Sequence, residues 1–248
     1  MNDFKFKLKK IYFSLENKKV IFSILFLFNI VMGFYKYDIT NLTFFEFVLY
    51  NITNNFYVLM LFFVLLIILF SSVSASKKNL NFILKFNNKE NFIGNVIESF
   101  VFEMCIVFLI NFLMIIIFSL LLFRGDYAIN NIPYYDVSFF AYFLFFYIRM
   151  ILILIIYGII IILLEKNFGK ILSLCGSILF MINLLLPMKK TSVLSIMDMK
   201  WYGSAYLNLV QYPTFMTELF CSLLYIFVLM ILVGSLIYIY IKYSKDIK

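Results

Sequence analysis

Charged side chains are rare inside the long apolar stretches of this sequence, and Arg149 is the most informative of them. It stands near the middle of the stretch 137–164. An arginine at the centre of a membrane helix costs at least about 2.5–3.5 kcal/mol, so it must pair or face water. Glu98 and Glu103 are the only acidic residues of the neighbouring stretch 95–123. We expect an Arg149–Glu103 pair; Arg149, Glu103 and Glu98 either line a substrate path or form a structural ion pair.

The residue types exclude several kinds of catalytic chemistry. Histidine is absent, which removes histidine metal sites, histidine general bases and Ser–His or Cys–His pairs. Cys105, Cys175 and Cys221 all lie in apolar stretches, and we interpret them as small hydrophobic side chains. The fragment 167–171 has one glycine before its lysine and no hydroxyl after it, unlike a phosphate-binding loop. We therefore expect no metal, no cofactor and no enzyme activity in this chain by itself.

The composition requires a membrane. Hydrophobic residues make up 65% of the 248 residues, more than a soluble domain can bury. The three prolines, Pro133, Pro187 and Pro213, lie between the apolar stretches, so each stretch can form an uninterrupted helix. We predict an all-α integral membrane protein with one transmembrane domain, 1–248, and six transmembrane helices. The expected spans are 20–35, 56–75, 95–123, 137–164, 171–186 and 219–241, with an outer loop at 36–55.

The lysines indicate the orientation of these spans. Most of them fall in the N-terminal segment 1–19, in 77–94, in the turn 165–170 and in the C-terminal tail. Positive charge is retained on the cytoplasmic side of a membrane, so both termini are expected in the cytoplasm. Segment 1–19 also has an apolar stripe, which predicts an amphipathic helix lying on the inner membrane surface. Its stripe consists of Phe4, Leu8, Ile11, Tyr12 and Leu15.

The segment 77–94 is the largest inward-facing connection, and we call it the coupling segment. In a short helix here, one face is apolar through Leu80, Ile83 and Leu84, and another through Phe82 and Phe86. Two apolar faces suit a helix that packs on the membrane domain and fills a groove on a partner. Charged residues, among them Lys89 and Glu90, resemble the polar rim of an interface. The alternative is a loop that packs only on its own helix bundle.

The segment 187–218 differs from an ordinary exposed loop, because it mixes aromatic and polar residues throughout. Trp201, Tyr206 and Tyr212 combine a ring with a polar group, and such residues are typical of the membrane interface. We predict two short re-entrant helices here, dipping into the outer leaflet. Within the spans, Asn111 is a lone polar residue that is expected to form a hydrogen bond between helices.

The order of these segments resembles the membrane subunits of ABC-2-type transporters. It has a basic interfacial helix, six spans, a coupling loop between the second and third spans, and a long outer segment between the last two. The resemblance implies a dimer with a second permease copy or homologue. It also implies a separate cytoplasmic ATPase that holds ATP and Mg. Small members rich in Phe and Lys look like exporters of amphipathic or antimicrobial peptides, or like immunity pumps.

Three functions are therefore compared. The first is a permease subunit driven by a partner ATPase. The second is a membrane immunity or sensor protein that sequesters a peptide without transport. The third is an intramembrane enzyme, against which the absence of histidine and of clustered acidic residues argues. The cargo, the direction of transport and the choice between homodimer and heterodimer stay open.

Overall fold

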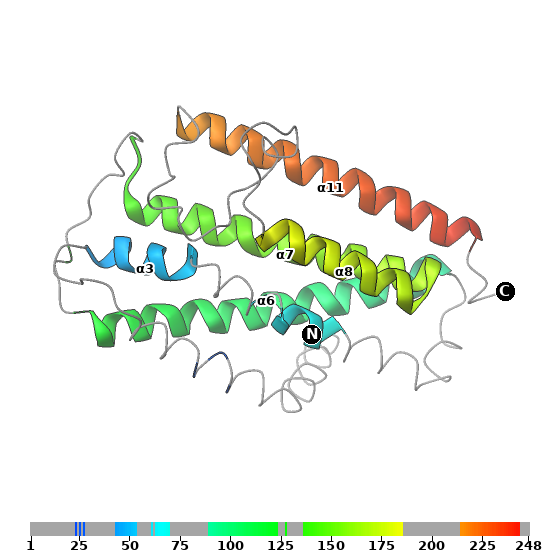
Figure 1. Cartoon of the computed structure of the whole chain (residues 1–248), viewed down its shortest axis with the longest axis horizontal. Helices are drawn as coiled ribbons and strands as arrows, with labels where there is room; N and C mark the ends of the chain where they lie inside the picture. Colours follow the sequence, from blue (N-terminus) through cyan, green and yellow to red (C-terminus); the bar gives the residue numbers. More distant parts are fainter. Residues whose placement is uncertain are drawn as a thin grey trace, which may run out of the picture.

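The chain folds as helices packed along a common direction. The computed structural model describes residues 23, 25, 27, 43–53, 61, 63–69, 89–123, 127, 136–185 and 214–243. Within them the protein is all-helical and has no strand. The helices are α3 (Phe44–Thr53), α6 (Lys89–Leu122), α7 (Phe139–Phe168), α8 (Lys170–Leu185) and α11 (Phe215–Tyr243), as Figure 1 shows.

Three of these helices are long and apolar enough to cross a membrane. They cover Glu90–Leu121, Phe139–Phe168 and Phe215–Tyr243, and a shorter apolar helix covers Lys170–Leu179. The protein is therefore a membrane protein with transmembrane helices. The six-span count and the N-terminal helix 1–19 stay predictions, because much of the chain that they concern lies outside the described residues.

Helix α7 is the centre of the fold. It packs against α3, α6, α8 and α11, and Figure 1 shows it between α11 on one side and α3 and α6 on the other. Within its most apolar window 72% of the residues are buried, compared with 33% for α6 and 22% for α11. The sequence of α7 is apolar on every side, which is typical of a helix surrounded by other helices.

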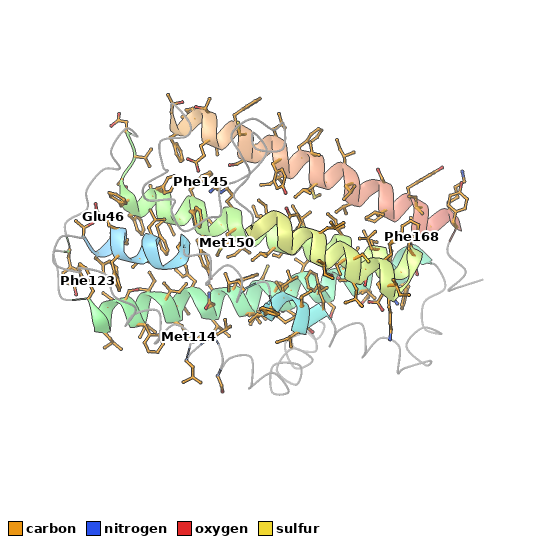
Figure 2. All side chains as sticks on the ribbon, in the orientation of Figure 1. Glu46, Met114, Phe123, Phe145, Met150 and Phe168 are labelled. Atoms are coloured by element: carbon orange, nitrogen blue, oxygen red, sulfur yellow. The ribbon has the colours of Figure 1, made fainter. Side chains whose placement is uncertain are left out.

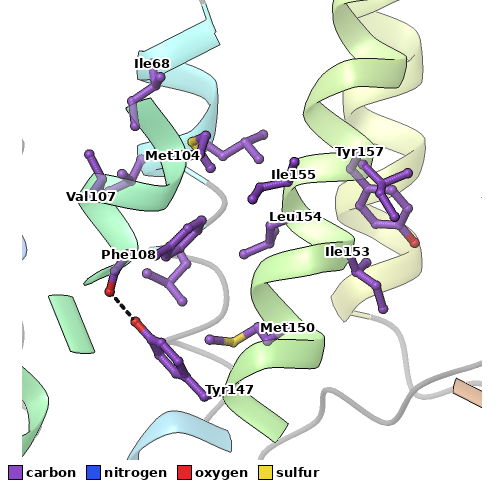
Figure 3. Packing of buried hydrophobic residues seen from close by; sticks show 14 of the residues in the cluster. Ile68, Met104, Val107, Phe108, Tyr147, Met150, Ile153, Leu154, Ile155 and Tyr157 are labelled. Carbon is purple, nitrogen blue, oxygen red and sulfur yellow. Dashed lines mark hydrogen bonds between the residues drawn. The ribbon is translucent and has the colours of Figure 1, made fainter. Parts of the chain in front are cut away.

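The core between α6 and α7 is built from large apolar side chains. Met104 and Phe108 of α6 and Met150 and Leu154 of α7 are fully buried, and Figure 3 shows these residues filling the space between the two helices. Burial of side chains of this size contributes about 1.5–3 kcal/mol each in a soluble protein. In a bilayer their contribution comes from close packing, because lipid is as apolar as the core.

A single glycine reverses the chain between α7 and α8. Gly169 has φ 90° and ψ 178°, and its N–H donates to the carbonyl oxygen of Glu165 at 3.0 Å. Helix α8 then packs against α7, and a Cβ atom added at Gly176 would lie 2.8 Å from Cδ1 of Leu164. Ser173 and Ser177, on the same helix, are buried. These small residues let the two helix backbones come close together. The turn that we expected at 165–170 is therefore shorter, since α7 continues through Phe168.

Gly169→Ala should lower the free energy of unfolding by about 1–3 kcal/mol, because φ 90° is strained for any residue with a Cβ atom. The matched control is Gly94→Ala, which lies inside α6 where an added Cβ meets nothing within 4 Å. Alanine there should raise stability by about 0.5–1 kcal/mol. Both values are measured by denaturing-detergent titration followed by circular dichroism. Equal effects of the two substitutions would contradict the strained turn.

The second half of the expected outer loop 36–55 is a helix instead. Helix α3 begins after Thr43, whose N–H donates to the Glu46 carboxylate at 2.6 Å. Phe47, Val48 and Ile52 are buried, and α3 packs against α6 and α7. Figure 2 shows Glu46 and Phe123 at the same end of the molecule, opposite Phe168. The apolar residues of this segment therefore join the core beside α6 and α7.

Candidate functional site

Arg149 forms a buried ion pair with Glu218. Its Nη1 atom lies 2.6 Å from Oε1 of Glu218, and the Arg149 side chain is 5% exposed. The expectation of an Arg149–Glu103 pair is thus wrong, because Arg149 faces α11 rather than α6. The sequence predicts that Glu218 is the last residue of the outer segment 187–218. Helix α11 begins at Phe215, however, so Glu218 lies in its first turn and inside the bundle.

Two hydroxyl groups complete this polar cluster. The Tyr142 hydroxyl donates to Oε1 of Glu218 at 2.9 Å, and Nη1 of Arg149 also donates to the Ser222 hydroxyl at 3.2 Å. Tyr142 and Arg149 are two turns apart on α7, and Glu218 and Ser222 are one turn apart on α11. The two helices therefore present these side chains on facing stripes. We call Tyr142, Arg149, Glu218 and Ser222 the polar cluster.

Aromatic rings enclose the charges. The guanidinium carbon of Arg149 lies 5.0 Å from the ring centroids of both Phe145 and Phe146. Phe215 of α11 packs edge-on against Phe145, with ring centroids 5.1 Å apart. These contacts add cation–π attraction and displace water from the cluster. Because the surroundings have a low dielectric constant, the loss of either charge leaves the other without compensation.

The N-terminal cap of α11 determines where Glu218 lies in the helix. Thr214 precedes the helix, and its hydroxyl accepts from the N–H of Thr217 at 3.3 Å. In return, the Thr217 hydroxyl accepts from the N–H of Thr214 at 3.2 Å. This reciprocal capping defines the start of the helix. Glu218 then lies in the first turn, where the positive end of the helix dipole favours a carboxylate.

A second set of polar contacts joins α7 to its neighbours. The Tyr147 hydroxyl donates to the carbonyl oxygen of Phe108 at 2.8 Å, as Figure 3 shows. Asn111 Nδ2 donates to the same hydroxyl at 3.3 Å, which confirms the expected hydrogen bond between helices. On the α11 side, the hydroxyls of Tyr157 and Tyr225 share a hydrogen bond.

The other predicted site residues lie elsewhere. Glu103 is buried on α6 and Glu98 is exposed on the same helix, and neither is the partner of Arg149. Lys89 and Glu90 form the start of α6. The remaining predicted residues lie outside the described residues, so their roles stay predictions. These are Leu80, Phe82, Ile83, Leu84 and Phe86 of the coupling segment, and Trp201, Tyr206 and Tyr212 of the outer segment.

Sequence reasoning missed Glu218, Tyr142 and Ser222. One signal could have found Glu218: the pair Pro213-Thr214 directly precedes an apolar run, and a threonine in that place is a typical helix start. A helix that begins there includes Glu218 in its first turn. No comparable signal marks Tyr142 or Ser222, because tyrosine and serine are frequent throughout the chain.

The polar cluster is chemically suited to binding and positioning. It combines one cation, one anion and two hydroxyl groups in a water-poor setting. In the part of the chain that the structure describes, no group of three or more Cys, Asp or Glu residues could hold a metal ion. Comparisons of the chain with protein-family models, with curated proteins and with solved structures found no match, so any functional assignment depends on the residues and contacts described above.

Proposed function

We propose that this chain is the membrane-spanning permease subunit of an ABC transporter of the ABC-2 type. A separate cytoplasmic ATPase, which holds ATP and Mg, drives it, and a second permease copy or homologue completes the pore. The cargo is an amphipathic or antimicrobial peptide, or similar hydrophobic material, that is exported across the bacterial cell membrane. The alternative is an immunity or sensor protein that binds such a peptide without transport.

The observation that carries this proposal is the continuity of the coupling segment with α6. The last residues of the coupling segment, from Lys89 onward, are the first turns of this 34-residue helix. At the α-helical rise per residue, α6 is about 50 Å long. A rod of this length can transmit a displacement from one side of a membrane to the other.

The start of α6 is also tied to α7. Phe92 and Ile93 are 2% and 3% exposed, and the Lys166 ammonium group lies 5.2 Å above the centroid of the Phe92 ring. A force applied to the coupling segment would therefore move α6 and the end of α7 together. Since α7 carries Arg149, such a movement would reach the polar cluster.

The charge at the ends of the helices supports the proposed orientation. Lys89, Lys166, Lys170 and Lys242 belong to the ends of α6, α7, α8 and α11 that lie together in Figure 1. Asp136 precedes α7 at the opposite end. A basic end is the one that membrane insertion retains in the cytoplasm, where an ATPase would bind.

Substitution of Phe82 and Phe86 by aspartate should separate the chain from its ATPase, because charged side chains cannot occupy an apolar groove on a partner. The matched control is leucine at both positions, which keeps the apolar character. The measurement is co-purification of chain and ATPase in mild detergent, together with ATP hydrolysis and export of a fluorescent amphipathic peptide by reconstituted vesicles.

Each result has a distinct meaning. Unchanged association and turnover in the aspartate variant would remove the coupling role of this segment. A wild-type chain that binds and protects against a peptide, but associates with no ATPase, would favour the immunity or sensor function instead.

A further inference from the structure

The two helices contribute different kinds of group to the polar cluster. Two donors to the carboxylate, the Arg149 guanidinium and the Tyr142 hydroxyl, belong to α7. The aromatic side chains next to the guanidinium, Phe145 and Phe146, belong to α7 as well. Helix α11 supplies the carboxylate of Glu218. Helix α7 therefore carries a set of groups that would bind a carboxylate from any source, and Glu218 shows how such a ligand is held.

Within the described residues, α11 packs mainly along one seam, which it forms with α7. The first part of this seam is polar, with Glu218, Ser222 and the half-buried Tyr225, whereas the next two turns are apolar, with Leu229 and Val233. A ligand carboxylate can take over the ion pair and hydrogen bonds that Glu218 makes, so that Arg149 keeps a counter-charge, whereas no ligand group replaces the apolar packing at Leu229 and Val233. The α11 end that holds Glu218 is therefore the end that can separate from α7.

The outer surface beside the polar cluster is apolar. Ile148 of α7, adjacent to Arg149, is 56% exposed. Met216 and Phe220 of α11 lie two positions from Glu218 and therefore project from the outer face of α11, where they are 70% and 65% exposed. In a membrane these side chains face the hydrocarbon. A ligand that reaches Arg149 from this direction needs an apolar chain in addition to its anionic group.

We infer that α7 is a receptor for the carboxylate of an amphiphile, built from Arg149 and Tyr142, and that Glu218 occupies it as a tethered internal ligand. A carboxylate on an apolar chain displaces Glu218, and the adjoining end of α11 then moves away from α7. The identity of this ligand as cargo rests on the proposed transport function. Binding itself needs no ATPase, so a failure of either proposal can be recognised separately.

The first test measures binding of octanoate to the purified full chain in detergent. Glu218→Gln should lower the Kd for octanoate about tenfold or more. It removes the Glu218 carboxylate, a competitor that α11 holds beside Arg149 at a millimolar or higher effective concentration. Adding Arg149→Met to Glu218→Gln should abolish saturable binding. Octyltrimethylammonium, which has the same chain and the opposite charge, should not compete. An equal Kd in wild type and Glu218→Gln, or binding that survives Arg149→Met, would overturn the inference.

The second test measures the reactivity of a cysteine and leaves the polar cluster intact. It therefore does not depend on whether the Glu218 and Arg149 variants fold. Cys221 is half-buried and adjoins Ser222, and Cys105→Ala with Cys175→Ala makes it the sole cysteine. Octanoate should raise its rate of reaction with a charged thiol reagent severalfold, and octyltrimethylammonium should not. The control is Val233→Cys with all three native cysteines replaced, which should stay unreactive. An unchanged Cys221 rate, or equal acceleration at residue 233, would overturn the inference.

Two sources of this carboxylate are possible, a peptide C-terminus and a fatty acid. Competition against octanoate distinguishes them, using an amphipathic peptide with a free or an amidated C-terminus, and oleate. Competition by the free but not the amidated peptide assigns the site to peptide cargo, and competition by oleate alone assigns it to a lipid. Competition by neither ligand would contradict the inference, because both carry the carboxylate and the apolar chain that the proposed receptor requires.

Discussion

Glu218→Leu should lower the free energy of unfolding of the helix bundle by about 3–5 kcal/mol, because it leaves the buried Arg149 guanidinium without its counter-charge. Arg149→Met should cost less, because Glu218 keeps the Tyr142 hydroxyl as a hydrogen-bond donor and lies in the first turn of α11, where the helix dipole favours a carboxylate. The measurement is a denaturing-detergent titration of the purified chain, followed by circular dichroism.

The double variant Glu218→Leu with Arg149→Met tests whether the two charges depend on each other. It removes both buried charges, so it should recover most of the stability that Glu218→Leu loses. The surface control is Ser235→Ala on the same helix, an exposed position whose hydroxyl only bonds the carbonyl oxygen of Ile231, and it should change stability by less than about 0.5 kcal/mol. A double variant as unstable as Glu218→Leu would show that the pair is not coupled.

The existence of a buried partner for Arg149 could be predicted from the sequence, but its identity could not. The cost of a charge in hydrocarbon depends only on the residue type and its depth. The partner depends on the rotation of α7 about its axis, because residues 147 and 149 point roughly 200° apart. In the structure Tyr147 faces α6 and Arg149 faces α11. A helix that is apolar on all sides has no polar face that would indicate this rotation.

The positions of the long apolar helices could also be predicted from the sequence, whereas that of the short helix α3 could not. The stretches expected at 137–164 and 171–186 lie within a few residues of α7 and α8, since length and hydrophobicity alone mark an apolar helix. Helix α3 was missed because its segment mixes phenylalanine with polar residues and is short. Its capping pair Thr43 and Glu46 was the informative signal. Short helices that are buried by their neighbours depend on tertiary packing more than on their own composition.

Gly158→Ala should destabilise the chain by about 1–3 kcal/mol, because the core between α6 and α7 has no room for a methyl group at this position. A Cβ atom added to Gly158 would lie only 2.7 Å from Cε1 of Phe100. The Phe100 ring is fully buried, so it cannot move aside without displacing its neighbours. A denaturing-detergent titration followed by circular dichroism measures the loss of stability. A loss of this size would indicate that α6 and α7 approach each other closely at Gly158.

The control for Gly158 is Gly234→Ala on α11, where an added Cβ meets nothing within 4 Å. Alanine there should stabilise the helix by about 0.5–1 kcal/mol, so the two glycines should respond with opposite signs. Phe100→Leu should also cost less in the Gly158→Ala background than in the wild type, because the smaller side chain leaves space for the new methyl group. If Gly158→Ala proves as stable as Gly234→Ala, then α6 and α7 are not packed through this contact, and the transmission of a displacement from α6 to α7 loses its main physical support.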